Sequence, residues 1–104
     1  MSMINIGGNV SNSVLSNIKP GDMQPNAVDL RLGEVYYIDS ADFKIDENQK
    51  LHRGSSAMPL HPDGYYHLSP GHYEVIMENE IKVSAGEAGF VITRSTLNRN
   101  GVFL

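Results

Sequence analysis

Two arginines and two hydroxyl residues stand close together near the end of the chain. They are Arg94, Ser95, Thr96 and Arg99, within the run TRSTLNRNGVFL at residues 93–104. An arginine presents a planar fork of N–H donors that matches phosphate oxygens, and a charge-assisted hydrogen bond of this kind contributes about 1.5–3 kcal/mol. The group is therefore a candidate phosphate site. From spacing alone, a polar surface loop with one helical turn is the alternative.

A short helical turn is expected in the same run. If Thr93 or Ser95 caps a turn that runs through Leu97 to Asn100, the first N–H groups of that turn also point at a bound anion. Gly101 and the apolar residues after it would then end the turn and open a strand at residues 101–104.

The same run resembles the second motif of the dCTP deaminase and dUTPase superfamily, Arg-Ser-Ser/Thr-Leu-Ala-Arg-x-Gly-Leu, which holds the triphosphate of a deoxynucleotide. The run MQPNAVDLRLGEVY, at residues 23–36, resembles the first motif, which reads Gln/Gly-Pro-x-Ser-Val-Asp-Leu-Arg-Leu-Gly in the deaminases. Residues 66–91 resemble the stretch between the motifs, and the likeness is weakest over residues 39–64. Two motifs in the right order are more specific than either alone.

The resemblance implies a function in pyrimidine nucleotide metabolism. Arg94, Ser95, Thr96 and Arg99 would hold the phosphates of a deoxyribonucleoside triphosphate together with Mg²⁺, as in a hydrolase that converts dCTP to dUTP. The family builds its sites between subunits, so a homotrimer is implied as well. The sequence Val-Asp-Leu-Arg-Leu-Gly favours the deaminase branch of the family, although the choice between cytosine and uracil as the base stays open.

The sequence departs from the family pattern at several places. Asn98 stands where a small residue, usually alanine, is found, and Asn100 is an added amide. The third motif carries the catalytic carboxylate, a glutamate in the deaminases and an aspartate in the dUTPases, and it would follow Leu104. We therefore expect a truncated chain with no catalytic residue of its own and little or no turnover. The alternative is that the apolar strand at residues 101–104 docks on a neighbouring subunit.

An alternative function belongs to a different class. A β-sandwich without the catalytic carboxylate is also compatible with a structural or regulatory subunit, for example of a viral particle or of a nucleotide sensor. Binding of a triphosphate by the two arginines distinguishes these hypotheses, because a purely structural module has no need of it.

Composition sets limits that do not depend on the resemblance. The chain has 104 residues, a net charge of −4, 40% apolar residues and no cysteine. These values predict one domain over residues 1–104, with a modest core and no disulfide framework. A mildly acidic chain is not typical of nucleic-acid binding, and no apolar run is long enough for a membrane span. A cytoplasmic location is expected, in the host cytoplasm if the protein is viral.

The elements that must position the arginines are predicted to be mostly strands. One short helix is expected over residues 11–18, ended by Pro20-Gly21. Alternating or apolar runs bounded by turns predict strands at residues 27–38, 42–46, 56–60, 65–68, 72–77, 81–83 and 89–93. Many short strands with almost no helix indicate an all-β sandwich or barrel. Under the resemblance this is a dUTPase-like fold of the β-clip type with an incomplete C-terminal half.

The remaining ionisable residues are interpreted as structural or solvated. The resemblance implies that Asp29 orders the backbone of the first motif and contacts with a neighbouring subunit, and is not a catalytic acid. No metal site is predicted from the histidines, because their spacing is loose and cysteine is absent; they are His52, His61, His67 and His72. The three glutamates near two turns are expected to be solvated charges; they are Glu78, Glu80 and Glu87.

Overall fold

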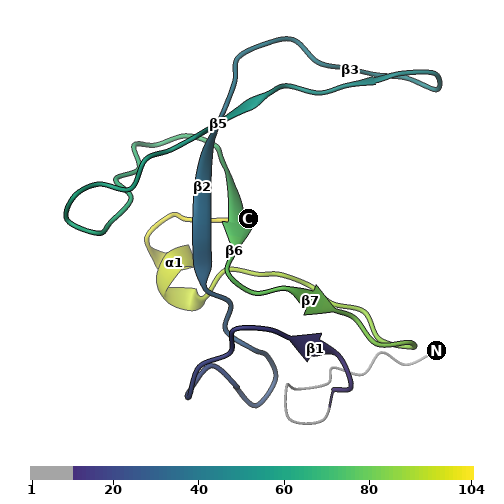
Figure 1. Ribbon diagram of the computed structural model, residues 1–104, viewed down its shortest axis with the longest axis vertical. Coiled ribbons are helices and arrows are strands. Elements are labelled where there is room, and N and C mark those ends of the chain that lie inside the picture. Colours follow the sequence, from purple (N-terminus) through teal and green to yellow (C-terminus); the bar gives the residue numbers. More distant parts are fainter. Residues whose placement is uncertain (1–10) are drawn as a thin grey trace.

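A three-stranded antiparallel sheet forms the centre of the computed structural model, which describes residues 11–104. Its strand order is β5-β2-β6, with β2 at Leu32–Ile38, β5 at Ser55–Ala57 and β6 at Tyr73–Met77. Figure 1 shows β2 running through the middle of the molecule beside β6, with β5 crossing its upper end. The predicted strand at residues 72–77 is confirmed.

The alternating sequence pattern explains why these strands pack as they do. Successive side chains of a strand point to opposite faces. In β6 the residues Tyr73, Val75 and Met77 are half-buried, while the two between them are exposed. Val75 lies opposite Val35, the most buried side chain of the described residues, at 1% exposure.

Two smaller strand pairs flank this sheet. The first joins β1, Val14–Leu15, to β7, Ile81–Lys82, and the second joins β3, Lys44–Ile45, to β4, Lys50–Leu51. The only helix of residues 11–104 is α1, Ser95–Arg99. The all-β class is thus confirmed, with sheets that do not close into a barrel, and no helix in this part of the chain has the length and apolarity to cross a membrane.

The helix predicted over residues 11–18 is wrong, because this segment contains β1. Its serine hydroxyls bond elsewhere instead of capping a helix: both Ser11 and Ser13 donate to the carboxylate of Glu87, at 2.5 and 2.6 Å. Asn17 adopts a left-handed φ of 55°, which ends the extended segment. Partners more than 60 residues away in sequence therefore override the local helix signal.

Several predicted strands are shorter than expected or do not form. The strand expected at residues 27–38 begins only at Leu32, because the N–H groups of Asp29 and Arg31 bond to Asp22 and Asn79 instead of a neighbouring strand. Residues 65–68, 89–93 and 101–104 form no strand. The expected strands at 42–46 and 56–60 are represented by β3 and β5.

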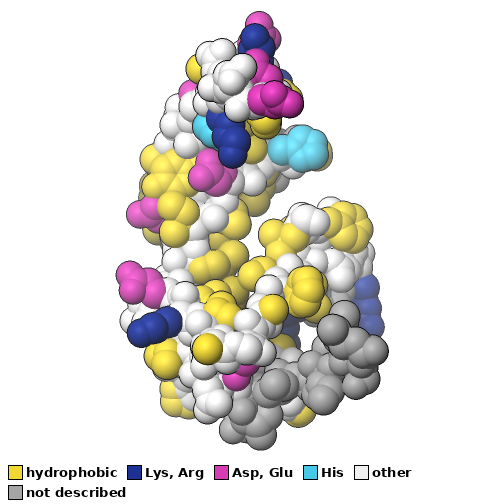
Figure 2. Space-filling model, turned by 90° about the vertical axis from the view of Figure 1, so that its right-hand side faces the viewer, with side chains coloured by type: hydrophobic (Ala, Val, Ile, Leu, Met, Phe, Trp, Pro, Cys, Tyr) yellow, Lys and Arg dark blue, Asp and Glu magenta, His cyan; other side chains and the backbone are white. Residues whose placement is uncertain are grey.

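The core of the described residues is small and partly polar. Only Val35 and Met58 are buried apolar side chains, and Asp22 and Asn79 are buried with them. The radius of gyration is 16.9 Å, against about 13 Å for a compact domain of this length. In Figure 2 the apolar side chains gather around a hollow in the middle of the visible face. The chain is therefore an open structure that leaves much apolar surface uncovered.

Candidate functional site

The helix α1 lies within the run at residues 93–104, and it ends in a glycine motif. The N–H of Val102 donates to the carbonyl of Leu97 at 2.9 Å, and the N–H of Gly101 donates to Asn98 at 3.1 Å. Gly101 has a φ of +77°, the left-handed conformation that this Schellman termination requires. The helical turn is thus formed as the sequence predicts, and its C-terminal end is fixed by backbone hydrogen bonds.

The N-terminal end of α1 differs from the prediction. Its N-cap residue is Arg94, with extended backbone at φ −65° and ψ 156°, and no side chain caps the helix. The hydroxyl of Thr93 donates to the side-chain oxygen of Asn98 instead. The unusual Asn98 therefore serves to fasten the segment before α1 to the helix, and a cap by Thr93 or Ser95 is wrong.

The structure places the four predicted phosphate ligands on one short exposed segment. Arg94 directly precedes α1, and Ser95, Thr96 and Arg99 belong to it. Residues four apart lie on the same helix face, so Ser95 and Arg99 are neighbours on α1. Within residues 11–104, the hydroxyls of Ser95 and Thr96 and the guanidinium of Arg99 have no hydrogen-bond partner. They are therefore open to a ligand from solvent.

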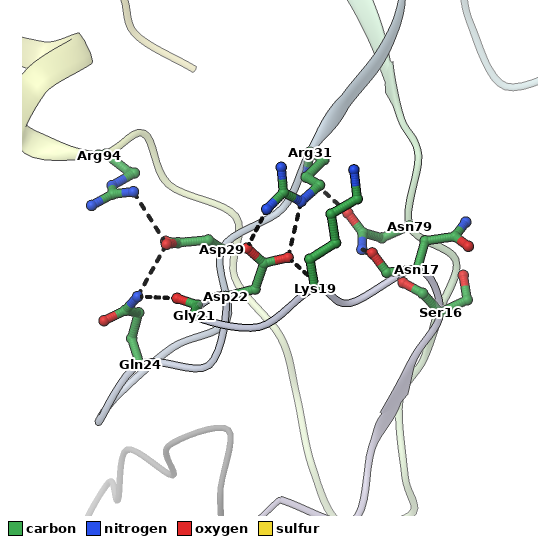
Figure 3. Close-up of polar contacts among 10 residues, drawn as sticks. All are labelled: Ser16, Asn17, Lys19, Gly21, Asp22, Gln24, Asp29, Arg31, Asn79 and Arg94. Atoms are coloured by element: carbon green, nitrogen blue, oxygen red, sulfur yellow. Dashed lines mark hydrogen bonds and ion pairs between the residues drawn. The ribbon is translucent and has the colours of Figure 1, made fainter.

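Arg94 forms an ion pair with Asp29, which belongs to the run at residues 23–36. Its Nη1 donates to Oδ2 of Asp29 at 3.1 Å, and Gln24 Nε2 donates to the same oxygen at 3.2 Å. Figure 3 shows Arg94 and Gln24 converging on this carboxylate. The Asp29 side chain is 21% exposed and that of Arg94 is 71% exposed. Two runs about 65 residues apart in sequence thus meet in space, and Asp29 orients Arg94, a contact that the sequence did not predict.

An ion pair between Arg31 and the buried carboxylate of Asp22 supports the segment that presents Asp29. Arg31 donates from Nε and Nη2 to both carboxylate oxygens of Asp22, at 3.0 and 2.8 Å, and the N–H of Lys19 donates to Asp22 at 2.9 Å. The hydrogen bond from Arg31, followed by that from the Lys19 backbone, lowers the pKa of Asp22. Asp22 in turn accepts the N–H of Asp29 through its carbonyl at 2.8 Å. The pair therefore fixes the backbone from which Asp29 reaches Arg94.

Asn79 connects this network to β1. Its Oδ1 accepts the backbone N–H of Arg31 at 2.9 Å, and its Nδ2 donates to the carbonyl of Ser16 at 2.7 Å and, more weakly, to that of Asn17 at 3.4 Å. These contacts, drawn in Figure 3, join three segments that are distant in sequence.

Comparison with known proteins identifies one family over nearly the whole chain. The family model described as dCTP deaminase-like matches residues 8–104. The chain belongs to this family. No solved structure matches the chain significantly.

Several relatives share the name deoxyuridine 5'-triphosphate nucleotidohydrolase. The deoxyuridine 5'-triphosphate nucleotidohydrolase of Methanocaldococcus jannaschii is 30% identical over 102 residues, which are 95% of this chain and 65% of that protein. The probable deoxyuridine 5'-triphosphate nucleotidohydrolases of Aeropyrum pernix and Methanococcoides burtonii are 31% and 33% identical over 84 and 85 residues, and the matches cover 52% and 49% of those proteins. The chain thus spans about half to two thirds of the length of these relatives.

One glutamate of this dCTP deaminase-like chain is not the solvated charge that was predicted. Glu87 is half-buried and accepts the hydroxyls of Ser11 and Ser13 and the N–H of Asn12, the last at 2.8 Å. These hydrogen bonds, led by those of the two hydroxyls, lower the pKa of Glu87 to about 2. Glu87 therefore fastens the start of the described chain to the turn after β7.

Sequence reasoning also missed how two of the histidines are arranged. His61 and His67 both contact the carboxylate of Asp63, whereas His52 and His72 are exposed and lie outside this group. The signal was the short run His-Pro-Asp-Gly, whose turn brings residues on either side of the aspartate together.

Proposed function

We propose that the chain binds the triphosphate of a pyrimidine deoxyribonucleoside triphosphate, with Arg94, Ser95, Thr96 and Arg99 as the phosphate ligands. The observation that carries the proposal is the contact between Arg94 and Asp29. This contact holds the Arg94 side chain beside Asp29, which belongs to the first motif. It uses only one N–H group of the guanidinium, so the other N–H groups can donate to a phosphate. Membership in the dCTP deaminase-like family supports the nucleotide as the ligand.

Each residue has a distinct part in this site. Arg94 keeps one nitrogen on Asp29, and its remaining N–H groups donate to phosphate oxygens as a planar fork. Ser95 and Thr96 add short hydroxyl donors. Arg99 adds a second positive charge on the helix face of Ser95. Asp29 is a positioning residue, since without its carboxylate the exposed Arg94 side chain has many rotamers.

Mg²⁺ fits this site as a companion of the nucleotide. Magnesium in triphosphate sites is usually held by phosphate oxygens, waters and one or two carboxylates. Asp29 is the carboxylate bonded to Arg94, and the described residues place no group of three metal-ligating side chains around the four phosphate ligands. The ion would therefore bind together with the triphosphate and neutralise part of its charge. Asp29 is the nearby carboxylate that could contact the ion.

The reaction is proposed from the family and the relatives. The names of the relatives indicate hydrolysis of dUTP, and the name of the family indicates deamination of dCTP. Both reactions use a water that a carboxylate activates as general base. The sequence contains no match to the third motif that supplies this carboxylate, so we propose that the chain by itself binds nucleotide and turns it over slowly or not at all.

Assembly into a homotrimer is part of the proposal. The exposed apolar side chains and the large radius of gyration favour an assembly in which copies of the chain cover one another. The same observation favours the alternative, a structural or regulatory subunit that does not bind nucleotide. Light scattering of the purified chain tests the assembly, and nucleotide binding separates the two functions.

The test of the phosphate site compares arginine variants at constant net charge. Arg94→Ala and Arg99→Ala should each weaken binding of dUTP or dCTP by about 10- to 150-fold, which corresponds to one charged hydrogen-bond group. Arg53→Ala removes the same charge from a residue that contacts Phe43 and Ala41, outside the site, and should leave affinity unchanged. Equal affinities for all three variants would contradict the proposal.

A further inference from the structure

The loop between β5 and β6 brings two histidines onto one aspartate. His61 Nδ1 lies 3.1 Å from Asp63 Oδ1, and His67 Nε2 lies 2.6 Å from Asp63 Oδ2. The centres of the two imidazole rings are 4.4 Å apart. One ligating atom from each residue lies within 4.8 Å of the other two, and all three side chains are exposed. No other group of three such residues occurs in the described chain.

The backbone of the loop holds this group in place. The N–H of Gly64 donates to the carbonyl of His61 at 2.9 Å, and the N–H of His61 donates to the carbonyl of Tyr65 at 3.1 Å. Gly64 has a φ of +84°, which favours glycine at this position of the turn. The N–H of Tyr65 donates to Asp63 Oδ1 at 2.9 Å and orients the carboxylate. These hydrogen bonds all lie within residues 61–65, so the turn itself holds His61 beside Asp63.

We propose that His61, Asp63 and His67 form a binding site for a divalent transition-metal ion of the Zn²⁺ type. Two imidazole nitrogens and a carboxylate oxygen are a ligand set that Zn²⁺ accepts, with water in the open position. Bonds of about 2.0–2.2 Å to a tetrahedral ion place its ligand atoms about 3.4 Å apart. The nitrogen–oxygen separations of 3.1 and 2.6 Å are shorter than this, and all three ligand atoms lie within 4.8 Å of one another, so the exposed side chains would rotate to reach an ion placed between them.

This site is separate from the proposed magnesium and nucleotide site. Mg²⁺ prefers oxygen ligands, whereas imidazole selects zinc, copper, nickel or cobalt. None of the three ligands belongs to the segment of Arg94 and α1. Figure 1 shows the loop between β5 and β6 projecting from the sheet on the side away from the β3–β4 hairpin. An experiment that detects no Zn²⁺ binding therefore does not test nucleotide binding, and the reverse is also true.

Metal binding would fix the loop against the central sheet. Gly64 and Tyr65 line a hollow of about 460 Å³, together with Leu32 and Gly33 from the region of β2. The hydroxyl of Tyr66 reaches the carbonyl of Gly33 at 3.4 Å, which is a long hydrogen bond. An ion that ties His61 to His67 on either side of Tyr65 and Tyr66 would restrict these two tyrosines. We expect the metal to have a structural role, in which it reduces the mobility of the residues that line this side of the hollow.

The test is a calorimetric titration of the untagged full chain with ZnCl₂, in a buffer that does not chelate metal and without nucleotide. The expected result is saturable binding of one ion per chain. His61→Ala, His67→Ala and Asp63→Asn should each weaken binding at least about 10-fold, because loss of a mere hydrogen-bond partner of a metal ligand already costs about 10- to 100-fold. His52→Ala and His72→Ala are matched controls, because both remove an exposed histidine outside the group, and they should leave the affinity within about 2-fold of the parent.

Cobalt gives a second readout that does not depend on the stability of the variants. Co²⁺ added to the parent chain should produce visible absorption bands of a low-symmetry site with nitrogen and oxygen ligands, and Zn²⁺ should bleach them. Absence of saturable Zn²⁺ binding to the folded parent would overturn the proposal. Equal losses in the His52 and His72 controls would overturn it too, since they would assign the binding to scattered surface histidines.

Discussion

Replacing Asn79 tests whether the buried polar network holds the segment of the first motif in place. Asn79 is 8% exposed, accepts the N–H of Arg31 at 2.9 Å and donates to the carbonyl of Ser16 at 2.7 Å. Asn79→Ala leaves both backbone groups without their partner; a fully buried group left unsatisfied costs about 1–3 kcal/mol, and these two are half-buried, so each cost lies in the lower part of that range. We expect the free energy of unfolding to fall by about 2–4 kcal/mol, a large part of the usual total of about 5–15 kcal/mol.

Two further variants make this result specific. Asn79→Asp preserves the volume but turns a carboxylate oxygen towards the carbonyls of Ser16 and Asn17, so it should destabilise the protein as well. Asn48→Ala is the control, because Asn48 is exposed and its side chain bonds to no residue of the described chain; it should change stability by less than about 0.5 kcal/mol. Urea unfolding followed by circular dichroism and tyrosine fluorescence measures all three. A loss for Asn79→Ala as small as that of the control would refute the role of the network.

Three other changes test separate parts of the structure. Gly33→Ala places a Cβ 2.8 Å from the carbonyl oxygen of Ile76 at a register shift between β2 and β6, so urea unfolding should show a loss of about 1–3 kcal/mol; no loss would contradict this close approach. Gly101→Ala forces a side chain into φ +77° and should cost about 1–2 kcal/mol in the same assay, unless α1 ends differently from the structure. Glu87 has its pKa lowered from 4.5 to about 2, so its stabilising effect is complete above about pH 4.5 and decreases as the pH falls towards 2. The difference in melting temperature between the parent and Glu87→Gln should therefore shrink over this range; a difference independent of pH would contradict the hydrogen bonds of Glu87.

The sequence was sufficient for those elements whose signals are local. The alternation of Tyr73, Val75 and Met77 predicts β6, and the turn at residues 84–87 is closed by a hydrogen bond from the N–H of Glu87 to the carbonyl of Ser84. The helical turn of α1 was also expected, since Asn-Gly at residues 100–101 is a local stop signal. In each case the residues that decide the structure are neighbours in the chain.

Distant partners decide the parts that the sequence did not predict. Residues 11–18 have a plausible helix pattern, yet β1 forms because Glu87 and β7 offer hydrogen bonds from the other end of the chain. The cluster around Asp63 and the contact from Arg94 to Asp29 depend in the same way on how turns and strands bring residues together. The four candidate phosphate ligands came from residue type and family resemblance, and their role stays a prediction.

Calorimetric titration of the purified chain with dUTP and dCTP, in Mg²⁺, tests the proposed nucleotide site most directly. The deoxynucleoside diphosphates and the corresponding ribonucleotides are the controls. We predict saturable heat that requires the triphosphate and that is strongly reduced in Arg94→Ala. Flat traces with both deoxynucleoside triphosphates, from a chain that circular dichroism shows to be folded, would contradict the site and favour a structural subunit.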